Sequence, residues 1–356
     1  MQVFRLKINQ FRNLLDLDIK FSPGFNVICG PNGSGKSSLL EAIYFLSLGR
    51  SFRSTLASRA INYKAKQFNL FAVVSGETFT TDLGLEKIRQ GKTKIKIANK
   101  TESISELAKL LPAQFINQNS YLLLSGGPKA RRQFIDWGVF HVEPLFFSIW
   151  QEFQQTLKQR NAALQRQVLI DQVKAWNYKL TQLAIEITRL REKYLQQLIP
   201  LITHLIDKLI HFQELKIEFY QGWDKEQYLG DVLNQSFLRD LKLGYTQYGP
   251  QRADLSIKLQ GHPVHEILSR GEQKLLTYAL QLAQGVLLKR TTQQACVYLF
   301  DDLFAELDFS KQNFLFELLG TLESQVFITA IEHNSFSALN QSLNAKVFRV
   351  ENGQIL

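Results

Sequence analysis

The sequence has few cysteines and no long apolar run. Its 356 residues include only two cysteines, Cys29 and Cys296, and each lies in or at the end of an apolar segment typical of a buried strand. They exclude a disulfide framework and offer no metal-ligand spacing. No apolar run reaches the roughly 18 residues that a membrane span needs, and the N-terminus lacks the apolar region of a signal peptide. We therefore expect a soluble, cytoplasmic protein.

Acidic residues are also outnumbered. Lys and Arg total 42 against 32 Asp and Glu, a formal net charge of +10. This excess suggests a polyanionic partner such as nucleic acid, although an ordinary basic enzyme can have the same balance. The hydrophobic content of 45% is typical of a globular chain, and the length suits two lobes.

The beginning of the chain has the alternating apolar pattern of strands, and the middle has the spacing of helices. Strands are expected over 3–8, 15–21, 25–29, 68–74, 79–85 and 92–97, with a helix over 37–48. Between Trp176 and Leu198 apolar residues alternate steps of three and four, which indicates either the core stripe of a helical bundle or a short antiparallel coiled coil. Pro200 should kink or end that helix.

The last third of the sequence has a mixed pattern. A helix is expected after Gly271, running to about Leu288. Buried strands are expected over 296–300 and 325–329, followed by a closing hairpin over 345–356.

One segment carries a specific chemical meaning. Residues 30–37 match the phosphate-loop pattern G-x-x-x-x-G-K-[ST] in full, with a buried strand before and a helix after. Backbone N–H groups and the helix N-terminus would cradle phosphate oxygens, Lys36 would reach the β- and γ-phosphates, and Ser37 would ligate Mg²⁺. The residues expected to hold the nucleotide are Gly30, Pro31, Asn32, Gly33, Ser34, Gly35, Lys36, Ser37 and Ser38.

An acidic pair follows the buried strand over 296–300. Asp301 is placed to hold Mg²⁺, and Asp302 is placed to orient or deprotonate an attacking water. The plainer alternative is a pair of strand-end carboxylates that face solvent.

Two further segments resemble motifs of ABC ATPases. Residues 268–274, Leu-Ser-Arg-Gly-Glu-Gln-Lys, are similar to the family's signature, which faces the γ-phosphate held by the opposite subunit; Ser269 is also a good N-cap for the next helix. Residues 305–308 resemble the D-loop. The order of these motifs matches ABC ATPases and differs from that of kinases and small GTPases.

Within that class nearly the whole chain resembles the RecF family of SMC-like ATPases. The resemblance is carried by Phe11-Arg12-Asn13 and by residues 49–53, 126–132 and 248–255. Some positions depart from the family pattern: Phe52 and Gln251 stand where His is usual, and residues 116–120 diverge, with Gln118 as the candidate Q-loop residue.

The resemblance implies an α/β fold, an ABC-ATPase head with mixed sheets around the phosphate loop and a mainly α-helical second lobe. Residues 1–115 and 286–356 would form lobe I, and residues 116–285 would form lobe II with the signature segment.

The resemblance also implies ATP and Mg²⁺ as cofactors and an ATP-dependent homodimer with weak, DNA-stimulated ATPase activity. Lys36, Asp301 and Asp302 of one subunit and Ser269 of the other would carry catalysis. Arg12 and Asn13 would contact the nucleotide, and Arg53 would approach its phosphates; the alternative for Arg12 is a surface ion pair.

The implied partners are duplex DNA, single-strand/double-strand junctions, RecO and RecR, with recombinase loading at gaps as the outcome. Candidate DNA contacts are Arg131, Arg132, Lys92, Lys94 and Lys96, although lysines also protect sheet edges from pairing. Two other readings remain: a transporter nucleotide-binding subunit, and a structural SMC-like protein whose ATP site only gates assembly.

Overall fold

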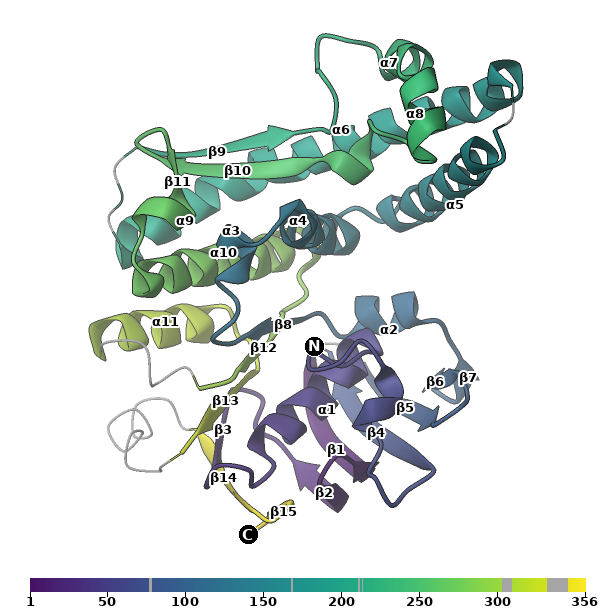
Figure 1. Cartoon of the computed structure of the whole chain (residues 1–356). Helices are drawn as coiled ribbons and strands as arrows, with labels where there is room; N and C mark the ends of the chain where they lie inside the picture. Colours follow the sequence, from purple (N-terminus) through teal and green to yellow (C-terminus); the bar gives the residue numbers. More distant parts are fainter. Residues whose placement is uncertain (77–78, 168, 211, 213, 303–308, 332–344) are drawn as a thin grey trace. The chain divides into compact units, whose positions relative to one another are not determined.

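The chain folds into two compact units (Figure 1). The computed structural model describes residues 1–76, 79–167, 169–210, 212, 214–302, 309–331 and 345–356. Unit 1 comprises Met1–Ser120 and Leu288–Leu356, and unit 2 comprises Tyr121–Leu287. In the part of the chain that is described, no helix combines the length and the apolar character needed to cross a bilayer.

Unit 1 contains an antiparallel sheet in the order β2-β1-β4-β5-β6-β7. Its strands are β1 (Gln2–Phe11), β2 (Leu14–Lys20), β4 (Gln67–Ser75), β5 (Thr80–Ile88), β6 (Thr93–Ile97) and β7 (Lys100–Thr101). In β4 the buried residues alternate, from Phe68 to Val74, because successive side chains point to opposite faces. One face of this sheet therefore contributes to the core.

The second sheet of unit 1 positions the phosphate loop. Its order is β15-β14-β3-β13-β12-β8, and every neighbouring pair except β14 with β15 is parallel. The strands are β3 (Phe25–Cys29), β8 (Ala113–Ile116), β12 (Val297–Phe300), β13 (Val326–Ala330), β14 (Lys346–Glu351) and β15 (Gln354–Ile355). All residues of β3, β12 and β13 are buried, as expected for central parallel strands.

The remaining elements of unit 1 are α1 (Lys36–Leu48), η1 (Ala57–Ala60), α2 (Ile104–Leu110) and α11 (Phe309–Thr321). Leu39, Ile43 and Phe45 of α1 are fully buried in the core that the two sheets share. Because β3, β13 and β12 run parallel, the residues that follow β3 and β12 emerge at the same edge of the sheet.

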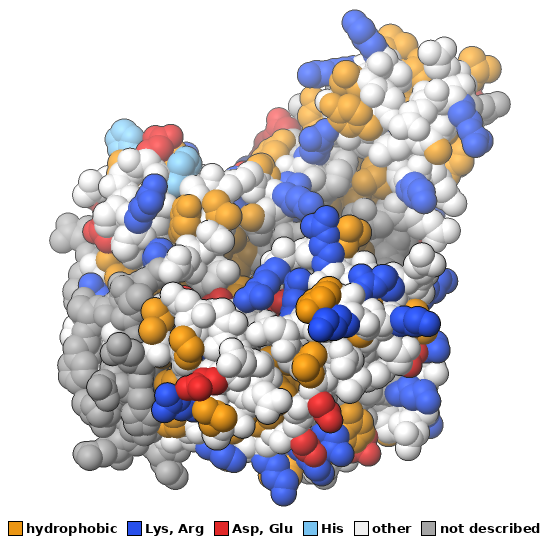
Figure 2. Space-filling model, turned by 60° about the horizontal axis from the view of Figure 1, so that its bottom comes forward, with side chains coloured by type: hydrophobic (Ala, Val, Ile, Leu, Met, Phe, Trp, Pro, Cys, Tyr) orange, Lys and Arg blue, Asp and Glu red, His pale blue; other side chains and the backbone are white. Residues whose placement is uncertain are grey.

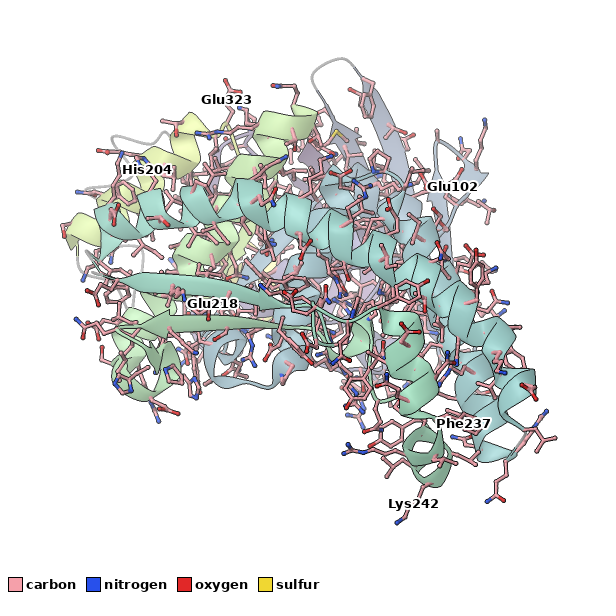
Figure 3. The ribbon with its side chains drawn as sticks, turned by 90° about the horizontal axis from the view of Figure 1, so that it is seen from above. Glu102, His204, Glu218, Phe237, Lys242 and Glu323 are labelled. Carbon is pink, nitrogen blue, oxygen red and sulfur yellow. The ribbon has the colours of Figure 1, made fainter. Side chains whose placement is uncertain are left out.

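Unit 2 is mainly helical, with one three-stranded sheet in the order β11-β10-β9. Its elements are α3 (Leu122–Ser125), α4 (Pro128–Val142), α5 (Phe146–Gln165), α6 (Ile170–Leu209), β9 (Leu215–Tyr220), α7 (Leu229–Gln235), α8 (Phe237–Leu243), η2 (Pro250–Arg252), β10 (Asp254–Leu259), β11 (His262–Pro263) and α9 (Val264–Ile267). Figure 3 shows α6 extending along the β9–β10 ribbon, which carries Glu218. Helix α10 (Arg270–Thr292) begins in unit 2 and ends in unit 1.

Helix α6 bears on two expectations from the sequence. It continues past Pro200 to Leu209, so of the two outcomes expected at Pro200, a kink or an end of the helix, the helix does not end there. Pro200 is exposed, and water can therefore satisfy the Gln196 carbonyl that loses its N–H partner. Because α6 packs against α4, α5, α7 and β9, its apolar stripe is part of a bundle core and not an isolated coiled coil.

Candidate functional site

The phosphate loop connects β3 to α1 and bends through glycines. Gly33 has φ 80° and Gly35 has φ 121°, values that residues with a side chain rarely adopt. At Gly35 a Cβ atom would lie 3.0 Å from the Asn13 side chain and from Leu14. The sequence therefore folds here into a tight loop that leads into the N-terminus of a 13-residue helix, the geometry of an anion-binding site.

Lys36 is the first residue of α1, and its side chain is turned back onto the loop. The residue is 7% exposed, and its Nζ donates to the carbonyl oxygens of Gly30 (2.7 Å) and Pro31 (3.0 Å). In the described part of the chain the buried Ser34 hydroxyl has no hydrogen-bond partner. Lys36 is thus a buried cation, and the Ser34 hydroxyl is a buried donor without a partner among the described residues. Both fit a loop that receives phosphate oxygens.

The acidic strand end lies beside the start of α1. Ser37 Oγ donates to Asp301 Oδ1 at 3.0 Å, and Thr329 Oγ1 donates to the same oxygen at 2.8 Å. The Asp302 backbone N–H donates to Thr329 Oγ1 at 3.0 Å. Asp302 itself has φ 59°, a conformation in which Asp is enriched. A hydroxyl and a carboxylate at this distance are oxygen ligands of the kind that Mg²⁺ uses.

Arg12 and Asn13 form the turn between β1 and β2, next to the phosphate loop. Asn13 Nδ2 donates to the carbonyl of Ser34 at 3.3 Å. Arg12 makes a two-pronged ion pair with Glu41 of α1, at 3.0 Å from Nε and 2.7 Å from Nη2. Glu41 is fully buried. Arg12 therefore has an ion pair, but with a buried partner, whereas the alternative expected from the sequence was an ion pair at the surface.

These groups line one pocket within unit 1. Its volume is about 510 Å³, within the range of small-molecule sites. The residues lining it are Arg12, Asn13, Asn32, Gly33, Gly35, Lys36, Ser37, Ser38, Arg53, Ile61, Asn62, Tyr63 and Asp302. The structure thus brings the phosphate loop, the Arg12–Asn13 turn, Arg53 and Asp302 together at one concave surface.

Ser269 lies in unit 2, immediately before α10. Its Oγ accepts from the Glu272 backbone N–H at 3.3 Å, while Glu272 Oε2 accepts from the Ser269 N–H at 2.9 Å and from its hydroxyl at 2.7 Å. This is a reciprocal capping box. The side chain of Ser269 is exposed, so the cap leaves it accessible from solvent.

The two arginines proposed as DNA contacts have partners inside unit 2. Arg131 makes a two-pronged ion pair with Asp254, at 2.7 and 3.0 Å, and also donates to the Gly126 carbonyl. Arg132 donates to the Ala253 carbonyl at 2.8 Å, and burial lowers the pKa of its guanidinium. This geometry favours a structural role for both residues over phosphate contact.

The three lysines near β6 are exposed. Lys92 precedes the strand, which begins at Thr93, one residue later than the strand expected over 92–97. Lys94 lies opposite Glu86 in β5, with Nζ 3.1 Å from the carboxylate. Figure 2 shows Lys and Arg side chains spread over the displayed face, with Asp and Glu in fewer places.

Several predicted features stand apart from the pocket. Gln118 is exposed beyond the end of β8. The segment 305–308 lies outside the described residues. Residues 61–63 line the pocket but were not predicted from the sequence. Nor were Thr329, which is next to last in the apolar strand β13, and Glu41, which interrupts the apolar stripe of α1. A polar residue at a buried position is the one signal that could have indicated Thr329 or Glu41.

The two sheets around a phosphate loop, with an acidic strand end beside the loop, define an ABC-type ATPase head of the SMC kind. The protein-family model described as RecF/RecN/SMC N terminal domain matches residues 2–355 of this chain. The DNA replication and repair protein RecF of Psychromonas ingrahamii is 42% identical over 357 residues, covering 100% of this chain and 99% of that protein. The RecF of Haemophilus influenzae is 43% identical over 356 residues, with the same coverage. This chain belongs to the RecF family.

Solved structures agree with this fold. The recombination mediator protein RecF with ATP has a TM-score of 0.88 at 24% identity, covering 100% of this chain and 97% of that one. An Smc head bound to the C-winged helix domain of ScpA has a TM-score of 0.61 at 16% identity, covering 100% and 97%. The predicted family and the predicted ABC-ATPase fold are therefore confirmed.

Proposed function

We propose that this protein is an ATP-binding protein of recombinational DNA repair, whose ATP-bound dimer closes on duplex DNA near single-strand gaps and helps to load a recombinase. One observation carries the proposal: Ser37 Oγ donates to Asp301 Oδ1 at 3.0 Å. This hydrogen bond joins the phosphate loop to the acidic strand end. Family membership supplies the repair context, and RecO and RecR are the partners proposed on that ground.

Within this proposal the polar groups at the start of α1 and at the acidic strand end have separate tasks. Lys36 exchanges its carbonyl partners for β- and γ-phosphate oxygens. Ser37 and Asp301 would hold Mg²⁺, which would supply positive charge to neutralise the phosphate oxygens. Thr329, bonded to Asp301 Oδ1 at 2.8 Å, keeps that carboxylate oriented, and Asp302 orients or deprotonates the attacking water.

We infer slow hydrolysis from Asp302. ABC transporters usually have a catalytic Glu at this position, and Asp is one methylene shorter, so the water must come nearer to the backbone to be activated. Steady-state turnover should therefore be slow. The resemblance to the RecF family is the ground for expecting that DNA stimulates it. A fast rate that DNA leaves unchanged would contradict this inference.

The dimer proposal rests on Ser269, which is exposed at the N-terminus of α10. Ser269→Arg should abolish ATP-dependent dimers in analytical ultracentrifugation while the monomer still binds ATP. Ser103→Arg is a matched control, because Ser103 is also an exposed N-cap that accepts from a backbone N–H three residues on. If the Ser269→Arg protein still dimerises with ATP, Ser269 is not part of a shared site.

The DNA proposal rests on the net charge of +10 and on the exposure of Lys94 and Lys96. Changing both to Glu should weaken binding to duplex DNA and reduce its dependence on salt. Lys242→Glu is the control, since Lys242 points into solvent from α8 in unit 2 (Figure 3). An affinity that barely changes with salt would exclude phosphate contact as the main contribution.

The remaining alternative is a structural SMC-like protein whose ATP site only gates assembly. Asp302→Asn separates the two, because it removes the group proposed to activate water and leaves the phosphate loop intact. In an active ATPase this substitution should slow both hydrolysis and DNA release. In a gating-only protein DNA release should stay the same. Membership of the RecF family favours the repair ATPase over a transporter subunit.

A further inference from the structure

A tyrosine of the pocket has no task in the function proposed above. Tyr63 lines the pocket that contains the phosphate loop, and it is 82% exposed. Large aromatic side chains lose favourable burial when they remain in solvent. A solvent-exposed ring at the wall of a small-molecule pocket is therefore a candidate surface for a planar ligand group.

The backbone that carries Tyr63 is held in place by its neighbour. Asn62 is 5% exposed; its Nδ2 donates to the Arg12 carbonyl at 2.6 Å, and its Oδ1 accepts from the Lys64 N–H at 3.0 Å. The Asn62 N–H donates to the Gln10 carbonyl at 2.9 Å. Tyr63 thus lies in a turn fixed to the end of β1, and such a platform loses little entropy on binding.

The strand order gives the pocket a direction. Asp302 follows β12, which lies on one side of β3 beyond β13. Asn13 lies on the other side, where the Gly353 N–H, in the turn between β14 and β15, donates to the Ser34 carbonyl at 2.8 Å. The pocket therefore extends from Asp302, across the phosphate loop, to the Arg12–Asn13 turn.

Tyr63 belongs to the Asn13 end of this pocket, because Asn62 binds the carbonyl of Arg12. The γ-phosphate end is marked by Lys36, Ser37 and Asp302. A nucleoside triphosphate with its terminal phosphate at Asp302 must direct its nucleoside toward the opposite end.

We propose that the ring of Tyr63 is the platform on which the base of the bound nucleoside triphosphate stacks; this rests on the proposed function. The Lys64 ammonium lies 5.5 Å from the ring centroid and adds a positive charge near that end of the site. Every base has a π-face that can stack on such a platform, but a purine covers more of the ring than a pyrimidine does. The preferred ligand class is therefore a purine nucleoside triphosphate.

The test compares ATP with inorganic tripolyphosphate, each titrated with Mg²⁺ into the full-length protein by calorimetry. Tyr63→Ala should weaken ATP binding about 5- to 20-fold, the lower part of the range for a base stacked on an aromatic side chain. Its tripolyphosphate affinity should stay at the wild-type value, because that ligand has no base. Tyr63→Phe should bind ATP as the wild type does.

Tyr178→Ala is the matched control, since Tyr178 is 69% exposed in unit 2, and it should leave both affinities unchanged. Unchanged ATP affinity in Tyr63→Ala would overturn the inference. An equal loss for ATP and tripolyphosphate would do the same, because it would indicate a damaged phosphate loop. An equal loss in Tyr63→Phe would assign the effect to the hydroxyl group. If the wild-type protein binds neither ligand, the proposed function itself fails.

Discussion

Glu41 offers the sharpest test of how the nucleotide pocket is built. Its carboxylate is fully buried on α1 and accepts hydrogen bonds from Arg12 Nε at 3.0 Å, Arg12 Nη2 at 2.7 Å and Ser51 Oγ at 2.5 Å. Arg53 Nη1 lies 3.7 Å away. One acidic side chain therefore fixes the Arg12 turn, the segment after α1 and a further cation of the pocket.

Replacing Glu41 with Gln keeps the volume and removes the charge. The new amide group would point N–H donors at the Arg12 guanidinium, which has only donors itself. Removing one partner of a buried ion pair costs about 3–5 kcal/mol. Because the Arg12 side chain is 22% exposed, water recovers part of that loss, and we expect unit 1 to lose about 2–3 kcal/mol of stability.

The assay must report on unit 1 alone. All four tryptophans lie between residues 137 and 223, within unit 2, so tryptophan fluorescence follows unit 2 only. Hydrogen exchange of peptides from α1 and β1, measured by mass spectrometry, reports the opening free energy of unit 1 directly. Glu41→Gln should lower protection in these peptides and leave the fluorescence midpoint in urea unchanged.

Asp18→Asn is the matched control. Asp18 pairs with Arg5 at 2.5 Å, but the two side chains are 45% and 36% exposed, and exposed pairs add little to stability. We expect no resolvable change in exchange for this variant. If Glu41→Gln also shows wild-type protection in α1, the carboxylate does not hold the Arg12 turn and the reasoning fails.

Two further predictions follow from other buried polar groups. Thr329→Val removes the hydrogen bond to Asp301 and should reduce Mg²⁺-dependent ATP turnover about 10-fold, as loss of a metal-orienting partner does; an unchanged dependence of turnover on Mg²⁺ concentration would contradict this role. Burial lowers the pKa of His141 in the folded protein to about 3, whereas in the unfolded chain the imidazole has its ordinary pKa of 6.5 and takes up a proton at higher pH. Stability should therefore fall as the pH decreases from 6.5 toward 3, by about 1–2 kcal/mol at pH 5 because the residue remains partly exposed. His141→Gln should flatten that dependence in urea titrations followed by tryptophan fluorescence.

The elements with a strong local pattern could be predicted from the sequence. The phosphate loop is a contiguous motif whose glycines, lysine and serine are fixed by spacing, and the apolar runs around it fit only buried strands. Asp301 and Asp302 were found for the same reason, since they directly follow such a run. Pro200 shows where a local rule fails, because an exposed helix surface tolerates the lost hydrogen bond.

Contacts that join distant segments could not be predicted. Arg131 appears in the sequence as one of two adjacent arginines in a basic chain, and only the fold reveals Asp254 opposite its guanidinium, 123 residues away. Charge alone therefore overestimates the DNA-binding surface, because it counts cations that are already paired inside the protein. Arginines with two-pronged carboxylate partners are poor candidates for phosphate contact.

The same reasoning separates two kinds of residue at the site: those buried behind the pocket and those that line it. Glu41 and Thr329 act through other side chains, so their effect depends on a three-dimensional network that no single sequence displays. Tyr63 differs, because its ring is exposed and its backbone is fixed through Asn62. An exposed aromatic on a fixed turn adds little to the core, and the proposed nucleoside ligand would cover it. Under that proposal the pocket has two halves: a phosphate half that its sequence motif reveals, and a nucleoside half whose residues come together only when β1 and the segment after η1 are brought side by side.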